Sequence, residues 1–557
     1  MKRILIFLLG LGVFSAVTGQ TAPDKYWIRF TDKANSPYSI DRPGEFLSAR
    51  ALERRDRYSI PVNSQDLPVN PAYMDSIRSA GAEILTRSRW FNAVTIRATD
   101  TSILQTIRKL PFVYQIKSAV YYKSSQLVKD KFETDFQFLT PSIDQTDTTL
   151  LRYGQATRQI GMLNGHILHN QGFQGQGMVI AILDGGFRNV NINRAFDSLR
   201  QSNRILGTWD FVGNKPVAYD EHSHGAQVLS TIGANLSGEM VGTAPRASFY
   251  LLLTEDTGSE LIIEEDNWVA GAEWADSAGA DLINSSLGYS TFDNPAQNHT
   301  YADMDGNSTR ITIAADMAAA RGMLVVSSAA NEGSTAWHYI TAPADADSIL
   351  TIGSVDSLGY YSPFSSTGPT FDRRIKPNVT AQGSWTAIVG TDGNIYRGSG
   401  TSFSSPVMCG LAACLWQINR SLPPMKIIEA IQASASQANS PDSLMGYGIP
   451  DFGKALFLIQ GMNPIPLTDE SLFRIFPNPF ADRLRVDFFS PERQEISIQL
   501  LSLTGRVMAS RKAEVGYTSV NSIELTEFHT LPNGMYILRI ITETGHHDRK
   551  VIRISQR

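Results

Sequence analysis

A series of short, mainly apolar runs lies between residues 178 and 355, and helical stretches separate them. The runs cover residues 178–183, 248–253, 281–285, 323–328 and 349–355, and the helical stretches include 268–278 and 316–321. Strands that are apolar along their whole length are buried on both faces, which favours a parallel sheet covered by helices on both sides. In such a sheet the functional groups gather at the carboxyl ends of the strands. The sequence therefore predicts an α/β domain with a site at that edge.

The pattern of apolar residues differs on either side of this domain. The 557 residues of the chain are also too many for one ordinary domain. Residues 24–122 predict a small α+β unit, with strands at 26–30, 90–96 and 112–116 and helices at 46–58, 73–79 and 103–107. Residues 123–154 are polar and rich in threonine, so we expect an exposed linker there. The α/β domain should then extend over residues 155–462. Residues 472–557 predict a small all-β sandwich, with strands at 484–488, 496–501, 506–509, 536–541 and 551–554.

The first residues have the pattern of a secretory signal peptide, which we place at residues 1–20. Lys2 and Arg3 are basic, residues 4–17 are apolar, and Ala16 and Gly19 are small residues before a cleavage site. A membrane anchor is the alternative, although the apolar run is short for a span. No cysteine follows the run, which disfavours a lipid anchor, and no later stretch is long and apolar enough to cross a bilayer. We therefore expect an exported protein.

Composition excludes some other classes. The net charge of −5 disfavours nucleic acid as the main partner. The two cysteines, Cys409 and Cys414, lie in one predicted helix and face different directions, so we expect two core thiols and no disulfide.

A glycine-rich turn at residues 398–400 leads into an apolar helix at residues 411–418. Ser402 lies between them, close to backbone N–H groups that a helix start leaves unpaired and that steady negative charge. Pro406 suits the first turn of this helix, where a missing N–H costs little. Taken alone, Ser402 has an ordinary explanation as the N-cap of a core helix.

Two further features lie upstream, each beside glycine. Asp184 follows the first apolar run and precedes Gly185; taken alone it is a turn or cap residue. His222 and His224 suggest a pair of metal ligands, although no third ligand has suitable spacing nearby. Together with Ser402, an aspartate and a histidine in this order supply the orienting group, the base and the nucleophile of covalent catalysis. Both histidines are candidates for the base.

Residues 155–462 resemble the subtilisin-family serine proteases, the subtilases. The resemblance is carried by segments that occur in the family's order: LDGG at 183–186, HGAQV at 224–228, GTAP at 242–245, NSSLG at 284–288, ANEG at 330–333, FSSTGP at 364–369, RIKPNV at 374–379 and GTS at 400–402. It implies a subtilisin-like parallel sheet and hydrolysis of peptide bonds by a secreted endopeptidase. A protein of this fold that binds without catalysing is the alternative function.

The resemblance also implies residue roles. Ser402 is the expected nucleophile, His224 the base, because Gly225 follows it as in the family, and Asp184 the orienting carboxylate. Asn331 is the expected side-chain donor to the oxyanion. Ser286, Leu287 and Gly288 are the expected substrate-binding segment, which pairs with an extended peptide.

Four positions depart from the family pattern. Gly185 stands where a serine or threonine is usual, Ala226 where a threonine, Ala330 where a glycine and Phe403 where a methionine. None of these changes removes a proton-transfer group. They bear on cleavage specificity and rate more than on the reaction class.

The flanking units complete the expected organisation. Residues 24–122 occupy the position of a subtilase propeptide, with removal expected within residues 123–153; a permanent accessory domain is the alternative. The C-terminal residues resemble the sorting domains of the type IX secretion system, through FPNP at 476–479, LTGRV at 503–507, LPNGMY at 531–536 and RKVIR at 549–553. Ligand binding by this domain as a surface adhesin is a further alternative.

These resemblances imply the partners and the location. The expected partners are protein or peptide substrates, the chain's own propeptide and the type IX machinery, and the expected location is outside a Gram-negative cell, released or on its outer-membrane surface. No cofactor is required for the expected reaction. Calcium is common in the family, but we assign no ligands to it in this chain.

Overall fold

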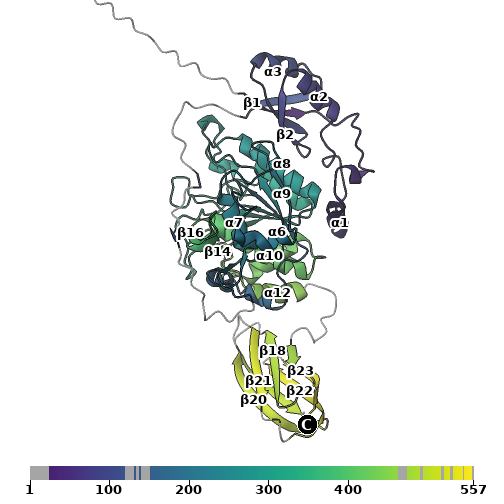
Figure 1. Ribbon diagram of the computed structural model, residues 1–557, viewed down its shortest axis with the longest axis vertical. Helices are drawn as coiled ribbons and strands as arrows, with labels where there is room; N and C mark the ends of the chain where they lie inside the picture. Colours follow the sequence, from purple (N-terminus) through teal and green to yellow (C-terminus); the bar gives the residue numbers. More distant parts are fainter. Residues whose placement is uncertain are drawn as a thin grey trace, which may run out of the picture.

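The structure is a computed structural model, which describes residues 24–119, 131–132, 137–138, 151–461, 473–489, 494–515, 520–526, 528, 531–542 and 545–554 (Figure 1). The predicted signal peptide and most of the predicted linker lie outside these residues. Among the described residues, none of the helices has both the length and the apolar composition that a bilayer span requires.

The central domain is built on a sheet of seven strands in the order β14-β13-β12-β11-β6-β10-β7. Every neighbouring pair in it is parallel. The strands are β6 (Val179–Asp184), β7 (Ile205–Asp210), β10 (Ser248–Leu253), β11 (Leu282–Ser285), β12 (Leu324–Ser328), β13 (Leu350–Val355) and β14 (Val379–Gln382). The prediction of a parallel sheet is confirmed, and the two strands it lacked are those at the sheet edges. Neither edge strand forms an uninterrupted apolar run: β7 is half exposed and β14 is short and partly polar.

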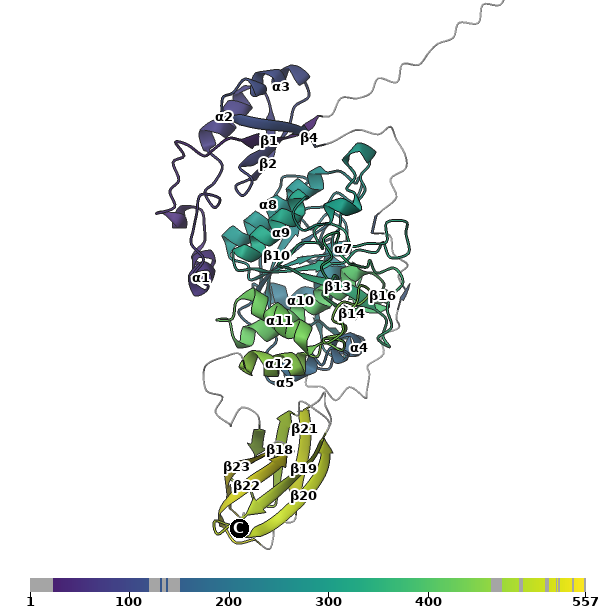
Figure 2. The ribbon, with the colours of Figure 1, turned by 180° about the vertical axis from the view of Figure 1, so that it is seen from behind.

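Helices cover both faces of this sheet (Figure 2). One face carries α7 (His224–Gly233) and α10 (Thr401–Ile418), and the other carries α8 (Ile263–Ala278) and α9 (Arg310–Ala320). Successive residues of β6 alternate between the faces, as the pleat of a strand requires: Ile180 and Ile182 pack with the first pair of helices, Ala181 and Leu183 with the second. The helix pairs therefore bury two separate cores on one sheet.

The start of α10 differs from the sequence expectation. The helix begins at Thr401, so Pro406 lies inside it and not in its first turn. A proline at this position cannot donate to the carbonyl four residues earlier, which belongs to Ser402. The hydroxyl of Ser286 donates to that carbonyl instead, at 3.0 Å. A side chain at the end of β11 thus makes an interior proline tolerable in α10.

Smaller elements surround the sheet. They are α4 (Thr157–Gly161), α5 (His166–Asn170), η2 (Arg194–Phe196), α6 (Asp197–Gln201), β8 (Asn235–Leu236), β9 (Met240–Val241), η3 (Pro295–Gln297), η4 (Tyr301–Asp303), β15 (Thr386–Val389), β16 (Ile395–Gly398), α11 (Pro424–Ser434) and α12 (Phe452–Gly461). Cys409 and Cys414 are both buried and unpaired in α10, as expected.

The N-terminal unit is an antiparallel sheet in the order β2-β3-β1-β4 with short helices. Its elements are β1 (Lys25–Phe30), η1 (Pro43–Glu45), α1 (Ala49–Arg57), α2 (Pro71–Ser79), β2 (Glu83–Ser88), β3 (Ala93–Arg97), α3 (Thr101–Arg108) and β4 (Val113–Ser118). The α+β prediction is confirmed. Strand β2, with its alternating polar residues, was absent from it.

Charged side chains are buried where this unit contacts the α/β domain. The carboxylate of Asp276 on α8 forms ion pairs with Arg54, Arg55 and Arg89 of the N-terminal unit, and its distance to Arg55 is 2.9 Å. The Asp276 side chain has no exposed surface. A second carboxylate, Asp66, pairs with Arg55 at 3.1 Å and with Arg321 of the α/β domain at 2.9 Å. We call these six residues the interface charge network.

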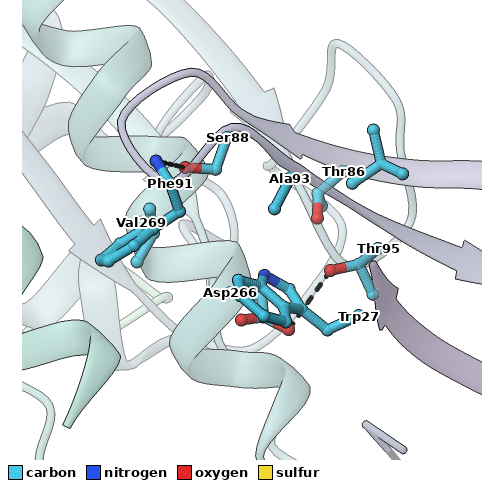
Figure 3. Close-up of a pocket in the computed structure, with 9 residues that line it drawn as sticks. Trp27, Thr86, Ser88, Phe91, Ala93, Thr95, Asp266 and Val269 are labelled. Carbon is cyan, nitrogen blue, oxygen red and sulfur yellow. Dashed lines mark hydrogen bonds between the residues drawn. The ribbon is translucent and has the colours of Figure 1, made fainter. Parts of the chain in front are cut away.

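A small pocket lies in the same interface (Figure 3). The hydroxyl of Thr95 on β3 donates to Asp266 on α8 at 3.2 Å. Residues of both units line this pocket: Trp27, Thr86, Ser88, Phe91, Ala93, Val94, Thr95, Asp266 and Val269. Strand β2 packs against α8 nearby.

The C-terminal residues form two antiparallel sheets, β17-β18-β21 and β20-β19-β22-β23. Their strands are β17 (Phe473–Phe476), β18 (Arg483–Phe489), β19 (Gln494–Leu501), β20 (Val507–Val515), β21 (Val520–Thr526), β22 (Gly534–Thr542) and β23 (Gly545–Arg553). Buried residues of both sheets, such as Val486 and Leu538, share one apolar core. This packing is that of the predicted sandwich.

Candidate active site

Asp184 and His224 meet at the carboxyl edge of the sheet. Asp184 is the last residue of β6, His224 is the first residue of α7, and their Oδ1 and Nδ1 atoms are 2.7 Å apart. Both side chains are buried. An ionised carboxylate accepts hydrogen bonds only, so Nδ1 carries the proton and Nε2 remains free to accept one. The pair therefore has the geometry of an oriented general base.

His222 lies beside this pair in a different position. Its Nδ1 accepts a hydrogen bond from the backbone N–H of His224 at 3.1 Å, at the start of α7. The contact with Asp184 thus favours His224 over His222 as the base. Among the described residues, the side chains that gather with metal-binding geometry are three glutamates and neither histidine.

Gly185 changes the surroundings of the Asp184 carboxylate. Its N–H donates to Oδ1 at 2.7 Å, while Oδ2 is buried and has no hydrogen-bond partner among the described residues. Gly185 lacks the hydroxyl that a serine or threonine, usual at this position in subtilases, would bring. A Cβ atom at Gly185 would lie 2.9 Å from the ring of Phe132. The glycine therefore leaves room for Phe132.

Ser402 is the second residue of α10 and lies next to the end of β11. Its Oγ donates to the carbonyl of Ser286 at 3.3 Å, and the Ser286 hydroxyl donates back to the carbonyl of Ser402 at 3.0 Å. This reciprocal pair ties the start of α10 to the predicted substrate-binding segment. Within the described part of the chain, Ser402 Oγ and His224 make no hydrogen bond. Contacts between a nucleophile and its base are often longer before substrate binds.

Asn331 contacts the same helix start. Its Oδ1 accepts hydrogen bonds from the backbone N–H of Thr401 at 2.9 Å and from the Thr401 hydroxyl at 3.0 Å. This pairing fixes the orientation of the amide and leaves Nδ2 as a donor beside Ser402. Asn331 therefore lies against the start of α10, and its role as the oxyanion donor stays a prediction.

Ala330, directly before Asn331, has a φ of 80°. This left-handed conformation costs a residue with a Cβ atom about 1–2 kcal/mol. The family's usual glycine would avoid that cost, so the alanine stores strain beside the predicted oxyanion donor.

Replacing this alanine should stabilise the protein. We expect Ala330→Gly to raise the free energy of unfolding by about 0.5–1 kcal/mol, since relief of strain exceeds the added entropy of the unfolded chain. Urea unfolding midpoints measured in a Ser402→Ala background, which prevents self-digestion, would test this. The neighbouring Ala329 is fully buried and outside the positive-φ group. Ala329→Gly should lower the midpoint, and a fall in both variants would contradict the strain argument.

The predicted substrate-binding residues follow β11. Ser286 and Leu287 are buried, whereas Gly288 is exposed. A Cβ atom at Gly288 would lie 2.2 Å from the Oγ1 of Thr341, so no other residue fits without a shift. This segment presents backbone groups with little side-chain bulk, which suits pairing with an extended peptide.

Parts of the predicted linker also lie at this site. The Phe132 ring stacks on the His224 imidazole with ring centroids 4.0 Å apart and an interplanar angle of 20°. Residues Gln137–Phe138 form β5, which pairs antiparallel with β16 four residues before Ser402. These residues were expected to be exposed; they lie against the α/β domain instead. The one sequence signal for this was the presence of aromatic residues in a polar stretch.

Comparison with known proteins agrees with this architecture. Residues 175–448 match the family model of the subtilases, residues 25–135 that of the peptidase S8 propeptide domain of Bacteroidota, and residues 474–554 that of the secretion system C-terminal sorting domain. The propeptide match extends past the expected boundary at residue 122 and includes Lys131 and Phe132.

Curated proteases of Halalkalibacterium and Bacillus are similar to half of the chain or more. A thermostable alkaline protease of Halalkalibacterium halodurans is 27% identical over 361 residues, 64% of this chain and 86% of that protein. Subtilisin E of Bacillus subtilis is 30% identical over 282 residues, 50% of this chain and 65% of that protein. The subtilisin of Bacillus pumilus is 29% identical over 286 residues, 50% of this chain and 92% of that protein.

The protein carries a subtilase-family (S8 peptidase) domain over residues 175–448. It carries an S8 propeptide domain before the peptidase domain and a type IX sorting domain after it. The sorting domain indicates secretion to the outside of the cell.

Proposed function

We propose that this protein is a secreted serine endopeptidase that hydrolyses peptide bonds through an acyl-enzyme, with Asp184, His224 and Ser402 as its catalytic residues. The observation that carries the proposal is the buried 2.7 Å contact between Asp184 and His224, beside the helix whose second residue is Ser402. The subtilase-family domain and the similarity to subtilisins support the broader class of serine peptidase.

The proposed reaction has two halves. Ser402 Oγ attacks the carbonyl carbon of the scissile peptide bond while His224 Nε2 accepts its proton. His224 then gives the proton to the leaving amine, and an ester links the remaining acyl group to Ser402. A water molecule, deprotonated by His224, hydrolyses this ester and restores the Ser402 hydroxyl. Asp184 holds the imidazole tautomer and stabilises the imidazolium in both halves.

The surrounding groups have supporting roles in the proposal. Asn331 Nδ2 and the backbone N–H of Ser402 donate to the oxyanion that forms on the carbonyl oxygen. Ser286, Leu287 and Gly288 pair with the backbone of an extended substrate. Side chains and water supply every proton in this scheme, so it includes no cofactor. A bound calcium ion remains an expectation from the family without assigned ligands.

The proposal extends to maturation. The partners are protein or peptide substrates, the type IX secretion machinery and the chain's own propeptide. The propeptide is released by cleavage within residues 123–153, and the product acts in the medium or on the outer-membrane surface of a Gram-negative bacterium. The contacts of Phe132 and β5 at the candidate site support an inhibitory role for this region before cleavage.

Active-site labelling tests the proposal against a subtilase fold that only binds. A fluorophosphonate probe should label the activated wild-type protein, and mass spectrometry should locate the adduct on Ser402. Ser402→Ala should abolish the labelling, whereas Ser404→Ala, two residues further along the same helix, should retain it. Absence of labelling, or labelling that persists in Ser402→Ala, would reject the proposed peptidase.

A further inference from the structure

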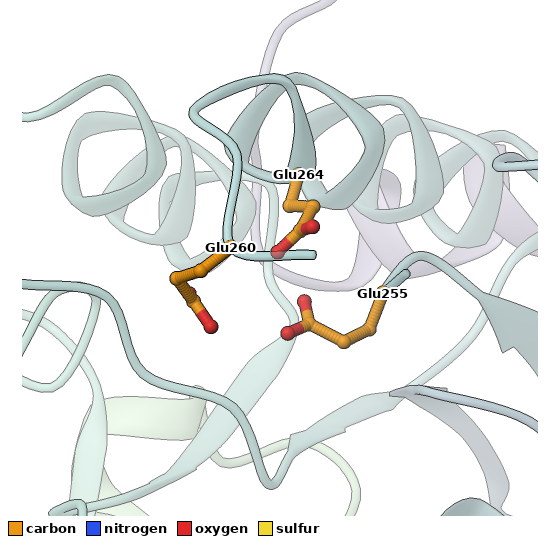
Figure 4. Close-up of side chains that lie close together, drawn as sticks. All are labelled: Glu255, Glu260 and Glu264. Carbon is orange, nitrogen blue, oxygen red and sulfur yellow. The ribbon is translucent and has the colours of Figure 1, made fainter. Parts of the chain in front are cut away.

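Three glutamates converge near the candidate active site (Figure 4). Glu255 follows β10, Glu260 lies in the next loop, and Glu264 is in the first turn of α8. One carboxylate oxygen from each lies within 4.8 Å of the others. The side chains of Glu255 and Glu264 are 4% and 0% exposed, and that of Glu260 is 28% exposed. We call this cluster the glutamate pocket.

A cationic group of the chain itself occupies the pocket. The Nζ of Lys131 contacts Glu255 and lies 3.1 Å from Glu260 and 2.9 Å from Glu264. It also donates to the carbonyl of Ser259 at 2.7 Å. Lys131 precedes Glu260 by 129 residues along the chain, so the contact is tertiary. The pocket is therefore built to hold an ammonium group.

The position of Lys131 resembles that of a substrate residue. The next residue, Phe132, stacks on the His224 imidazole at 4.0 Å and fills the space that Gly185 leaves. A few residues later, β5 pairs with β16, which precedes Ser402. One described part of this stretch thus contacts His224, and the other pairs, as an extended peptide does, with the strand that precedes Ser402 in the chain.

We propose that Glu255, Glu260 and Glu264 form a specificity subsite, which binds a lysine or arginine side chain of the substrate directly N-terminal to the residue that covers His224. Lys131 occupies this subsite in the uncleaved chain, and a basic residue of a substrate occupies it after the propeptide leaves. The inference rests on the proposed peptidase function and adds a substrate class to it.

Charge and burial explain why the pocket selects a cation. Burial by itself lowers the pKa of Lys131, but the three carboxylates outweigh it and raise that pKa. Burial and the nearby Glu255 raise the pKa of Glu260 to about 8, and the same causes raise that of Glu264. A neutral or acidic side chain would leave these carboxyl groups crowded and unpaired, which is costly in a buried site. A divalent cation is the competing occupant, because carboxylate oxygens also suit calcium.

Fluorogenic peptides with the sequence of residues 127–140 test the subsite with the activated full-length protein. Relative to the parent peptide, Lys131→Ala should lower kcat/KM by about 10²-fold, because the buried carboxylates lose their charged partner. The Lys131→Arg peptide should retain most of the activity. The matched control is Lys129→Ala, which removes a lysine two positions earlier and should change kcat/KM by less than about 3-fold. Mass spectrometry verifies that the same bond is cleaved in each peptide.

Protein variants test the pocket from the other side. Glu260 is the most exposed of the three glutamates. The preference for lysine is measured as kcat/KM for the parent peptide divided by kcat/KM for the Lys131→Ala peptide, and Glu260→Gln should reduce this ratio by about 10-fold. Glu429→Gln, an exposed glutamate on α11, should keep the ratio of the wild type. Equal cleavage of the parent and Lys131→Ala peptides would overturn the proposal. The proposal would also be overturned if the protein binds calcium saturably, Glu260→Gln abolishes this binding, and peptides are cleaved without a preference for lysine.

A measurement without catalysis separates this inference from the proposed function. In the full-length Ser402→Ala protein, Lys131→Ala should accelerate hydrogen exchange at residues 131–138 by about 10-fold or more, while Lys129→Ala should leave it unchanged. Unchanged exchange in both variants would reject the pocket as a lysine site, whatever the labelling of Ser402 shows. A failure of labelling with the exchange result as expected would reject the peptidase function, and with it the binding of substrates at this subsite, but would leave the binding of Lys131 by the three glutamates intact.

Discussion

Replacing Ser402 with alanine should lower kcat for peptide hydrolysis by about 10⁶-fold, the size of the loss known for the nucleophile of subtilisin. Without Oγ no acyl-enzyme forms, and the site retains only substrate binding and oxyanion stabilisation. The helix start itself should persist, because the contact that compensates for Pro406 uses the backbone carbonyl of Ser402. Hydrolysis of a fluorogenic peptide by the full-length protein would give kcat, with Ser404→Ala as the control that stays within severalfold of wild type.

A double variant tests whether the catalytic residues act together. If His224 serves only to move the Ser402 proton, Ser402→Ala/His224→Ala should be no slower than Ser402→Ala alone. Asp184→Asn should cost about 10⁴-fold in kcat, because the amide no longer fixes the imidazole tautomer that leaves Nε2 free. If the losses in kcat from the two single substitutions multiplied in the double variant, the residues would act independently and not as one triad. A loss in His222→Ala equal to that in His224→Ala would refute the assignment of the base.

Neutralising Asp276 should loosen the N-terminal unit from the peptidase domain. Asp276→Asn leaves the buried Arg54 and Arg89 without a carboxylate partner and leaves Arg55 with Asp66 alone, and removing one member of a buried ion pair costs about 3–5 kcal/mol. Amide hydrogen exchange in α1, measured in a full-length Ser402→Ala background, should therefore accelerate by about 10²–10⁴-fold. An exchange rate equal to that of the parent would contradict the energetic role of the interface charge network.

The control for this substitution is an exposed aspartate. Asp197 forms an i,i+3 pair with Arg200, and its side chain is 52% exposed. Asp197→Asn should change stability by less than about 1 kcal/mol and leave exchange in α1 unaltered.

The same network predicts a pH dependence. Burial favours a higher pKa for Asp276, but Arg89, Arg54 and Arg55 outweigh it and lower the pKa from 3.8 to about 2. A carboxylate with a lowered pKa stabilises the docked state above its ordinary pKa, and this contribution disappears as pH falls through the lowered value. Protection of α1 should therefore be constant above about pH 4 and decrease between about pH 4 and pH 2 in wild type. In Asp276→Asn this step should be absent.

Much of the site was accessible from the sequence because its residues lie in short motifs beside glycine. Asp184 ends an apolar run, His224 precedes Gly225, and the order of the motifs identified Ser402 and Asn331 as candidates. Without the family resemblance both histidines were candidates for the base, and the resemblance favoured His224 because Gly225 follows it. The 2.7 Å contact of His224 with Asp184 separates them, because it depends on where β6 and α7 meet in space.

The sequence was least informative where contacts join distant segments. Pro406 was expected in a first turn, since nothing near it shows that Ser286 supplies the missing donor. Phe132 and Lys131 belong to a polar stretch whose composition predicts exposure. Their partners, His224 and the glutamate pocket, lie far along the chain.

The sequence by itself determined the five inner strands of the central sheet, the α+β and all-β character of the flanking units and the candidate nucleophile, because periodicity, turn residues and motifs act over a few neighbouring positions. The tertiary structure decided which histidine meets Asp184, which groups receive Lys131 and how Asp276 gathers three arginines. Those outcomes depend on charges and hydrogen-bonding groups brought together from distant parts of the chain, whose energies depend on burial and separation. Neither the burial of these groups nor the distance between them can be read from a local sequence pattern.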